Sequence, residues 1–284
     1  MIVSISSIAS TAALRPHEAA HSYPQSARRP LQAAKPSVAG IVTSVHARTG
    51  RTLLARVLAE HFVLSGQRPL IFDTDPVDHR LQSCFPHETI VVDLNEVRDQ
   101  MTLFDTLAAP SRESRVANVS HQAFRKFFDV MSESGFETEA REHNIAPVIF
   151  YMTDRTPDSF EQGRLLRERF SEASFVLVEN AFVGEPKEVT RSSAGYQALS
   201  AHELRMTMPM LEGEFAEALD DPRFSLSELM RQPMALDDTR PEPQDELSFR
   251  ARSAIRTWLI RMFREIHRVS RAIEARAGEN AGNA

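Results

Sequence analysis

From about residue 38 onward, short runs of apolar residues alternate with stretches in which apolar residues recur at helical spacing. Short apolar runs bounded by turn-forming residues predict strands, and alternating strands and helices are typical of βαβ units around a mostly parallel sheet. The sequence therefore predicts an α/β fold in which helices flank a mostly parallel sheet. The expected strands are Val38–Ser44, Pro69–Phe72, Thr89–Val92, Arg115–Val119, Pro147–Met152 and Phe175–Val178, with a further candidate at Arg205–Met208.

Two segments between these strands carry a single apolar face. Thr52–Ser65 stops before Gly66, a residue that commonly closes a helix, and Gln122–Ser134 places large apolar residues at helical spacing. Both are expected to be helices that connect strands and pack on the sheet. The apolar positions are Leu54, Val57, Leu58, Phe62 and Leu64 in the first, and Phe124, Phe127, Phe128 and Met131 in the second.

A last helix is expected at residues 247–276, after an acidic, proline-containing linker at residues 231–246. Its apolar positions recur at three- and four-residue steps, and many arginines lie between them. Three surfaces suit such a helix: its own domain or a partner chain, the phosphates of non-specifically bound DNA, and an acidic membrane. Docking of the apolar stripe is the commonest use. The apolar positions are Phe249, Ile255, Trp258, Leu259, Met262, Phe263, Ile266 and Val269.

The two ends of the chain have a different composition. Residues 1–36 are rich in Ala, Ser, Arg and Pro, and such a segment buries too little apolar surface to fold. It is expected to be a disordered tail with a modest positive bias, and residues 277–284 are expected to be a second tail. The opening residues lack the basic region and compact apolar core of a signal peptide. One folded domain is therefore expected at residues 37–230.

Composition narrows the class of protein. A chain of 284 residues, of which 42% are hydrophobic, suits one main domain with appendages. The net charge of -6 is that of an ordinary soluble protein rather than a dedicated nucleic-acid binder. The single cysteine, Cys84, has no partner for an intramolecular disulfide, and no apolar run approaches the roughly 20 residues that cross a bilayer. We therefore expect a cytoplasmic protein.

The chemically informative residues lie where the first expected strand meets the first expected helix. Gly40–Glu60 and Ser65–Pro76 give, in order, a strand, a loop, a helix, a second strand and an Asp-Thr-Asp-Pro turn. Over about 40 residues this resembles the opening of ParA/MinD-type P-loop nucleotide-binding proteins, which have a deviant Walker A loop. In such loops, backbone N–H groups at a helix N-terminus cradle phosphate oxygens. The resemblance implies a three-layer α/β/α fold that binds ATP and Mg²⁺.

The loop departs from the family pattern. The family reads Lys-Gly-Gly-x-Gly-Lys-Thr where this chain has residues 46–52, and only Gly50 and Thr52 are unchanged. Arg51 stands at the phosphate-gripping lysine, and His46 stands at the signature lysine that reaches across an ATP-sandwiched dimer. The alternative is a relic loop of solvated residues. The nucleotide-binding residues implied by the resemblance are His46, Arg48, Thr49, Gly50, Arg51, Thr52, Leu53 and, at the adenine edge, Asn180, for which a turn-forming role is equally open.

The resemblance also implies a metal and a catalytic group. Thr52, Asp73 and Asn118 match the positions that hold Mg²⁺, and Asp73 and Asp75 match the two acids that organise the metal and the attacking water. Asn118 stands where the family has a Walker B aspartate, so Mg²⁺ binding should be weaker, because an amide brings no negative charge. The alternative for the two acids is that they cap the following turn.

These observations support three functions. The leading hypothesis is a ParA/MinD-like ATP-binding protein with slow or impaired ATP hydrolysis, in which nucleotide controls homodimerisation or the capture of a partner or cargo. The second is a pseudo-ATPase scaffold that no longer binds or hydrolyses ATP. The third is a nucleotide-independent DNA-binding protein that uses the basic helix at residues 247–276.

Overall fold

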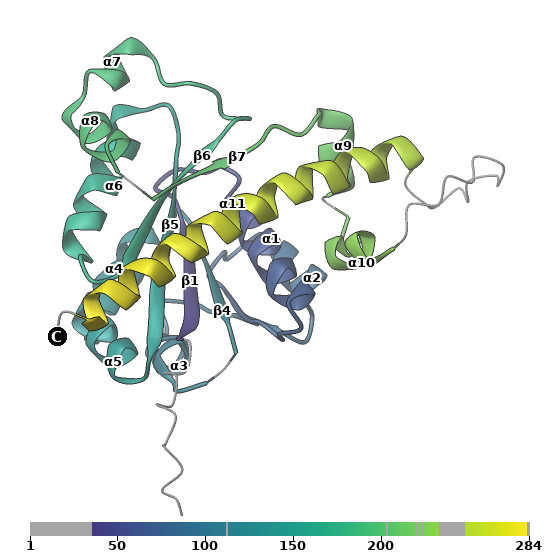
Figure 1. Cartoon of the computed structure of the whole chain (residues 1–284). Coiled ribbons are helices and arrows are strands. Elements are labelled where there is room, and N and C mark those ends of the chain that lie inside the picture. Colours follow the sequence, from purple (N-terminus) through teal and green to yellow (C-terminus); the bar gives the residue numbers. More distant parts are fainter. Residues whose placement is uncertain are drawn as a thin grey trace, which may run out of the picture. The chain divides into compact units, whose positions relative to one another are not determined.

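The computed structural model describes residues 36–232 and 248–282, apart from Arg112, Glu203, Asp220 and Arg223. Almost all of the expected N-terminal tail and of the expected linker therefore lies outside the described residues. The described residues form one compact unit (Figure 1).

Seven parallel strands form a single sheet in the order β3-β2-β4-β1-β5-β6-β7. This confirms the α/β fold with a parallel sheet, and the further candidate at Arg205–Met208 is its last strand. The second strand includes Asp73, one residue beyond its expected end. The strands are β1 (Ser37–Thr43), β2 (Leu70–Asp73), β3 (Thr89–Val91), β4 (Arg115–Val119), β5 (Ile145–Thr153), β6 (Ser174–Asn180) and β7 (Arg205–Met208).

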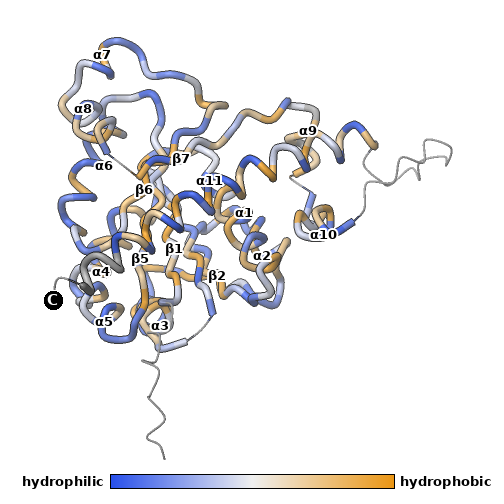
Figure 2. The backbone as a smooth tube through the Cα atoms, viewed as in Figure 1, coloured by the Kyte–Doolittle hydropathy of each residue, from blue (hydrophilic) through white to orange (hydrophobic). Residues whose placement is uncertain are grey.

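Helices cover both faces of the sheet, because successive strand residues point to opposite sides. In β1, Ile41 belongs to the apolar cluster that includes α3, α4, α5 and α6, whereas Val42 belongs to the cluster that includes α1, α10 and α11. Along these helices apolar and polar stretches alternate, as amphipathic packing requires (Figure 2). The helices are α1 (Arg51–Leu64), α2 (Arg80–Cys84), α3 (Val97–Ala108), α4 (Phe124–Glu133), α5 (Phe136–Glu142), α6 (Pro157–Arg169), α7 (Glu188–Arg191), α8 (Ala194–Ser200), α9 (Gly213–Ala218), α10 (Leu226–Arg231) and α11 (Phe249–Gly282).

The long C-terminal helix α11 docks on the protein's own domain. It crosses the face of the sheet that α1 also covers (Figure 1), and it contacts β7, α1, α9 and α10. Ile255, Leu259 and Met262 are completely buried, and each contributes on the order of 1.5–3 kcal/mol to stability. The indole N–H of Trp258 donates a hydrogen bond of 2.7 Å to the carbonyl of Pro209. Of the three surfaces that suit this helix, its own domain takes the apolar stripe.

Helix α1 is tied to the segment that follows β7. Arg56 donates to the carbonyl oxygens of Leu219 and Phe224, and it is 5% exposed. One helical turn further on, the carboxylate of Glu60 accepts hydrogen bonds from the N–H groups of Leu226 (3.1 Å) and Ser227 (3.0 Å). These two N–H groups begin α10, where a negative charge is favourable. A buried cation and a buried anion on α1 thus hold the chain before α10.

Candidate functional site

The loop at residues 44–50 leaves the carboxyl end of β1 and leads directly into α1. β1 pairs with β4 on one side and with β5 on the other. The strands β2 to β4 lie on the first side and β5 to β7 on the second, so the order of strands reverses direction at β1. In open α/β sheets, a crevice outside the carboxyl ends of the strands forms at such a switch in strand order. The topology therefore places this loop where α/β folds bind their ligands.

The backbone N–H groups of residues 45–53 donate to no acceptor within the part of the chain that the structure describes, and the first internal bond runs from Leu54 N to Gly50 O, 3.0 Å. Arg48 and Gly50 adopt left-handed conformations, with φ of 61° and 91°. Helix α1 has no side-chain cap and no acidic residue in its first turn. Unpaired N–H groups, left-handed turns and the positive end of a helix dipole together form an anion-binding concavity.

Gly50 is required by the close approach of the loop to the ends of β6 and β7. A Cβ atom at this position would lie 2.6 Å from Asn180 Nδ2 and 2.8 Å from the terminal methyl group of Met208. Asn180 donates to the carbonyl oxygen of Thr49 at 2.9 Å, and its own oxygen accepts from the N–H of Phe182 at 3.0 Å. Asn180 therefore supports the loop through Thr49 and the turn at Phe182.

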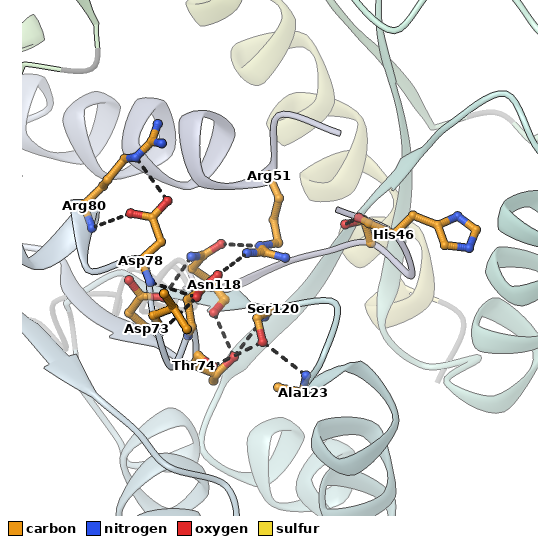
Figure 3. Close-up of polar contacts among 12 residues, drawn as sticks. His46, Arg51, Asp73, Thr74, Asp78, Arg80, Asn118, Ser120 and Ala123 are labelled. Carbon is orange, nitrogen blue, oxygen red and sulfur yellow. Dashed lines mark hydrogen bonds and ion pairs between the residues drawn. The ribbon is translucent and has the colours of Figure 1, made fainter. Parts of the chain in front are cut away.

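Four of the implied site residues form one hydrogen-bonded network (Figure 3). Arg51 donates from Nε to Asn118 Oδ1 at 2.9 Å and from Nη2 to Asp75 Oδ2 at 3.0 Å. Asn118 in turn donates from Nδ2 to Asp73 Oδ1 at 2.9 Å. Arg51 is only 8% exposed, so its guanidinium is largely enclosed by these partners.

The two carboxylates in this network have different environments. Burial raises the pKa of Asp73 to about 6, and the hydrogen bond from Asn118 offsets only part of that effect. Burial also acts to raise the pKa of Asp75, but the N–H groups of Asp78 and Val77 and the charge of Arg51 together bring it below its ordinary value. Asp75 is thus the ionised partner of Arg51, and Asp73 is the poorly solvated one.

His46 faces away from this network, as Figure 3 shows. Its Nδ1 lies 2.6 Å from Asp154 Oδ2, and its Nε2 lies 3.5 Å from Asp158 Oδ2. The ring borders an open cleft of about 710 Å³ between α4 and α6, which includes Phe128 and Arg169 in its lining. The structure therefore separates the side chain of His46 from the network around Arg51.

The remaining implied residues surround the loop. Arg48 lies exposed at its tip, and Thr52 and Leu53 are half-buried in the first turn of α1. Thr49 is buried, and its hydroxyl has no partner among the described residues.

Two supporting groups were not identified from the sequence. Thr74 Oγ1 donates to Asn118 O at 3.2 Å and accepts from Ser120 N at 2.9 Å, which joins the ends of β2 and β4. Asp154 holds His46, and it also accepts from the N–H and hydroxyl groups of Thr156, the residue that caps α6. An acid directly after a strand and before a Thr-Pro helix start is the sequence signal by which Asp154 could have been found.

No family model matches the sequence, and no curated protein matches it. Solved structures do. A nucleotide-binding protein of Archaeoglobus fulgidus in complex with ADP is 13% identical, with a TM-score of 0.43, over 75% of this chain and 94% of that chain. The MinC:MinD complex of Aquifex aeolicus gives 14% identity and a TM-score of 0.43, over 79% and 94% of the two chains. A Cyanothece McdA–ATP complex is 10% identical, with a TM-score of 0.41, over 79% of this chain and 96% of that chain.

All three likenesses are distant, in sequence identity and in TM-score. At these identities the likeness concerns the fold alone. No helix within residues 36–232 or 248–282 is both long enough and apolar enough to cross a membrane.

Proposed function

We propose that this protein binds ATP at the loop between β1 and α1, and that the bound nucleotide controls contact with a protein partner or a second copy of the chain. The observation that carries the proposal is the run of unpaired backbone N–H groups at residues 45–53. A polyphosphate supplies the acceptors that these groups lack, and the dipole of α1 favours its charge. The likeness to nucleotide-binding proteins agrees with this proposal but is too distant to support it.

The loop residues have distinct roles in this proposal. Gly50 permits the close backbone approach that a phosphate needs, and Asn180 holds the loop through Thr49. Arg48, exposed at the tip, adds positive charge for the outer phosphates. The hydroxyl of Thr52, in the first turn of α1, has no hydrogen-bond partner within the described part of the chain, so it can donate to a phosphate oxygen.

Hydrolysis is expected to be slow or absent. In-line attack on the γ-phosphate needs a group that positions water. Asp75 is held by Arg51 and by the N–H groups of Val77 and Asp78, and Asp73 is completely buried. Neither carboxylate is therefore free to orient a water molecule at the loop.

The outer side of α11 offers a surface for an acidic partner. Arg261, Arg264 and Arg271 are exposed, spaced by three and seven residues on one side of the helix, and no ion-pair partner is recorded for them within residues 36–232 or 248–276. The apolar stripe of α11 is buried against the domain, so contact with DNA or an acidic membrane would be electrostatic. Affinity for such a partner should fall steeply with salt and on neutralising these arginines.

Calorimetric titration of ATP and ADP into the full-length protein tests the proposal. We expect micromolar binding by the wild type and at least about tenfold weaker binding by Thr52→Ala, because one phosphate donor is lost. Thr102→Ala is the matched control, since Thr102 is an exposed helical threonine of α3. No binding of either nucleotide would overturn the proposal in favour of a scaffold that works without nucleotide.

A further inference from the structure

Magnesium is the ion that the resemblance implies at Thr52, Asp73 and Asn118. Mg²⁺ requires oxygen ligands in near-ideal octahedral geometry and is bound through carboxylates whose lone pairs are free. A magnesium site here would therefore need several oxygens of Thr52, Asp73 and Asn118 with free lone pairs.

Most of the carboxylate and amide oxygens at this position already accept hydrogen bonds from the protein. Asp73 Oδ1 accepts from Asn118 Nδ2 at 2.9 Å and from Asp75 N at 3.1 Å. Asn118 Oδ1 and Asp75 Oδ2 both accept from Arg51. Among the described residues of this network, one carboxylate oxygen, Asp73 Oδ2, has no partner, and it is buried. One enclosed carboxylate oxygen and the neutral hydroxyl of Thr52 do not make a magnesium site, so these residues do not fit the ion.

We propose that the Arg51 guanidinium takes the place of the divalent metal ion, so that this chain binds nucleotide without Mg²⁺. This inference rests on the proposed ATP-binding function. The guanidinium bridges Asn118 Oδ1, one of the implied metal ligands, and Asp75 Oδ2, and its fixed positive charge opposes the entry of a second cation.

The two departures from the family pattern, Arg51 and Asn118, form a complementary pair. Asn118 accepts from Arg51 and donates to Asp73 at the same time, which a carboxylate at position 118 is unable to do. A lysine at position 51 would offer a single nitrogen, whereas the planar fork of arginine spans Asn118 and Asp75. Each residue is therefore suited to the other, as expected of a rebuilt site rather than of two independent losses.

The experiment measures the metal dependence of binding directly. We expect the Kd of wild-type protein for ATP to agree within about threefold in EDTA and in excess MgCl₂, because Arg51 already neutralises the acids. We also expect wild-type protein without nucleotide to show no micromolar binding of Mn²⁺ in electron paramagnetic resonance titrations.

The double variant Arg51→Lys/Asn118→Asp should acquire micromolar Mn²⁺ binding, because it frees Asp75 and adds a third carboxylate beside Asp73. Arg98→Lys with Asn95→Asp is the matched control, since it makes the same chemical changes at exposed positions away from the loop. ATP binding by the wild type that weakens about tenfold or more in EDTA would overturn the inference, as would micromolar Mn²⁺ binding by the wild type.

The two proposals fail in different ways. If the wild type binds no nucleotide in either buffer, the proposed function is wrong, while the Mn²⁺ titrations still decide whether Arg51 excludes a metal. If ATP binds only together with Mg²⁺, the proposed function survives and the inference about Arg51 is wrong. Both wild-type measurements remain decisive even if the double variant does not fold.

Discussion

The amide of Asn118 donates a hydrogen bond of 2.9 Å to the carboxylate of Asp73, its register partner across the parallel strands β4 and β2. The donor is neutral, so it satisfies one carboxylate oxygen without supplying positive charge. Burial therefore dominates, and the pKa of Asp73 rises to about 6. Because Asp73 lies at the centre of the candidate site, the dependence of the protein's stability on pH reports on this network.

Replacing Asn118 by aspartate should destabilise the protein in a pH-dependent way. The change removes the donor and places two carboxylates side by side, which should cost about 1–3 kcal/mol at pH 7.5. At pH 5.5 the cost should be smaller, because one carboxylate of such a pair is protonated. Urea unfolding at both pH values measures the difference.

Asn95→Asp is the matched control for this change, because Asn95 donates to Asp93 at 2.9 Å on the surface. Its effect should be small at both pH values, since water screens exposed charges. If the two variants lose the same stability at pH 7.5, the buried contact between Asn118 and Asp73 has no special weight.

The stability contributed by Asp73 should fall as the pH rises. Its folded-state pKa of about 6 exceeds the ordinary value of 3.8, so the folded protein holds a proton that the unfolded chain has released between these values. Between pH 5 and pH 7.5 the wild type should therefore lose about 1.4 kcal/mol relative to Asp73→Asn, which has no such proton. Urea unfolding of both proteins gives this difference, and a difference that does not change with pH would contradict the assignment.

Gly50→Ala should damage the loop more than a comparable change elsewhere. Alanine at φ of 91° is strained, and its methyl group would also collide with Asn180 and Met208. We expect loss of ATP binding and about 2–5 kcal/mol of lost stability, the sum of a backbone term and an overpacking term.

Gly66→Ala isolates the backbone term, because Gly66 has φ of 77° and nothing within 4 Å of the added methyl group. It should cost about 1–2 kcal/mol and leave ATP binding unchanged. Equal losses in the two alanine variants would mean that the close approach of Gly50 to β6 and β7 is unimportant.

Asn180→Ala should weaken the binding of ATP and GTP by the same factor. Both polar atoms of Asn180 are engaged within the protein, one on Thr49 and one on Phe182, so its loss loosens the loop rather than removing a contact to the base. Titration of both nucleotides into wild type and variant gives the ratio of the two affinities. A selective loss of ATP binding would instead assign Asn180 to the adenine edge.

Much of the fold could be predicted from local patterns. Strands such as Arg115–Val119 are short apolar runs, and period-two alternation places Ile41 and Val42 in different layers. The order of strands could not be predicted in this way, since nothing local to β1 specifies β4 and β5 as its neighbours. Similarly, periodicity showed that α11 has a buried face but not that β7 and α1 cover it.

The candidate site was less accessible to sequence reasoning, because its pairings are long-range. Arg51 and Asn118 are separated by 67 positions in the sequence. Considered singly, each is only a departure from the family pattern. Their complementarity becomes visible only when the sheet brings the ends of β2 and β4 beside the start of α1. For the same reason the sequence did not distinguish an adenine-binding role of Asn180 from a turn-forming one, since its contact with Thr49 spans 131 positions.

Arg56 donates to the segment before α10, and Glu60 accepts from the first two N–H groups of α10. Helix α1 therefore connects the loop to α10. Arg51 and Glu60 lie about 13 Å apart along one rigid helical rod. Under the proposed function, a displacement of the first turn of α1 on ATP binding would also move the carboxylate that holds Leu226 and Ser227. The hydrogen-exchange rates of the Leu226 and Ser227 amides are therefore expected to change when ATP binds at the loop.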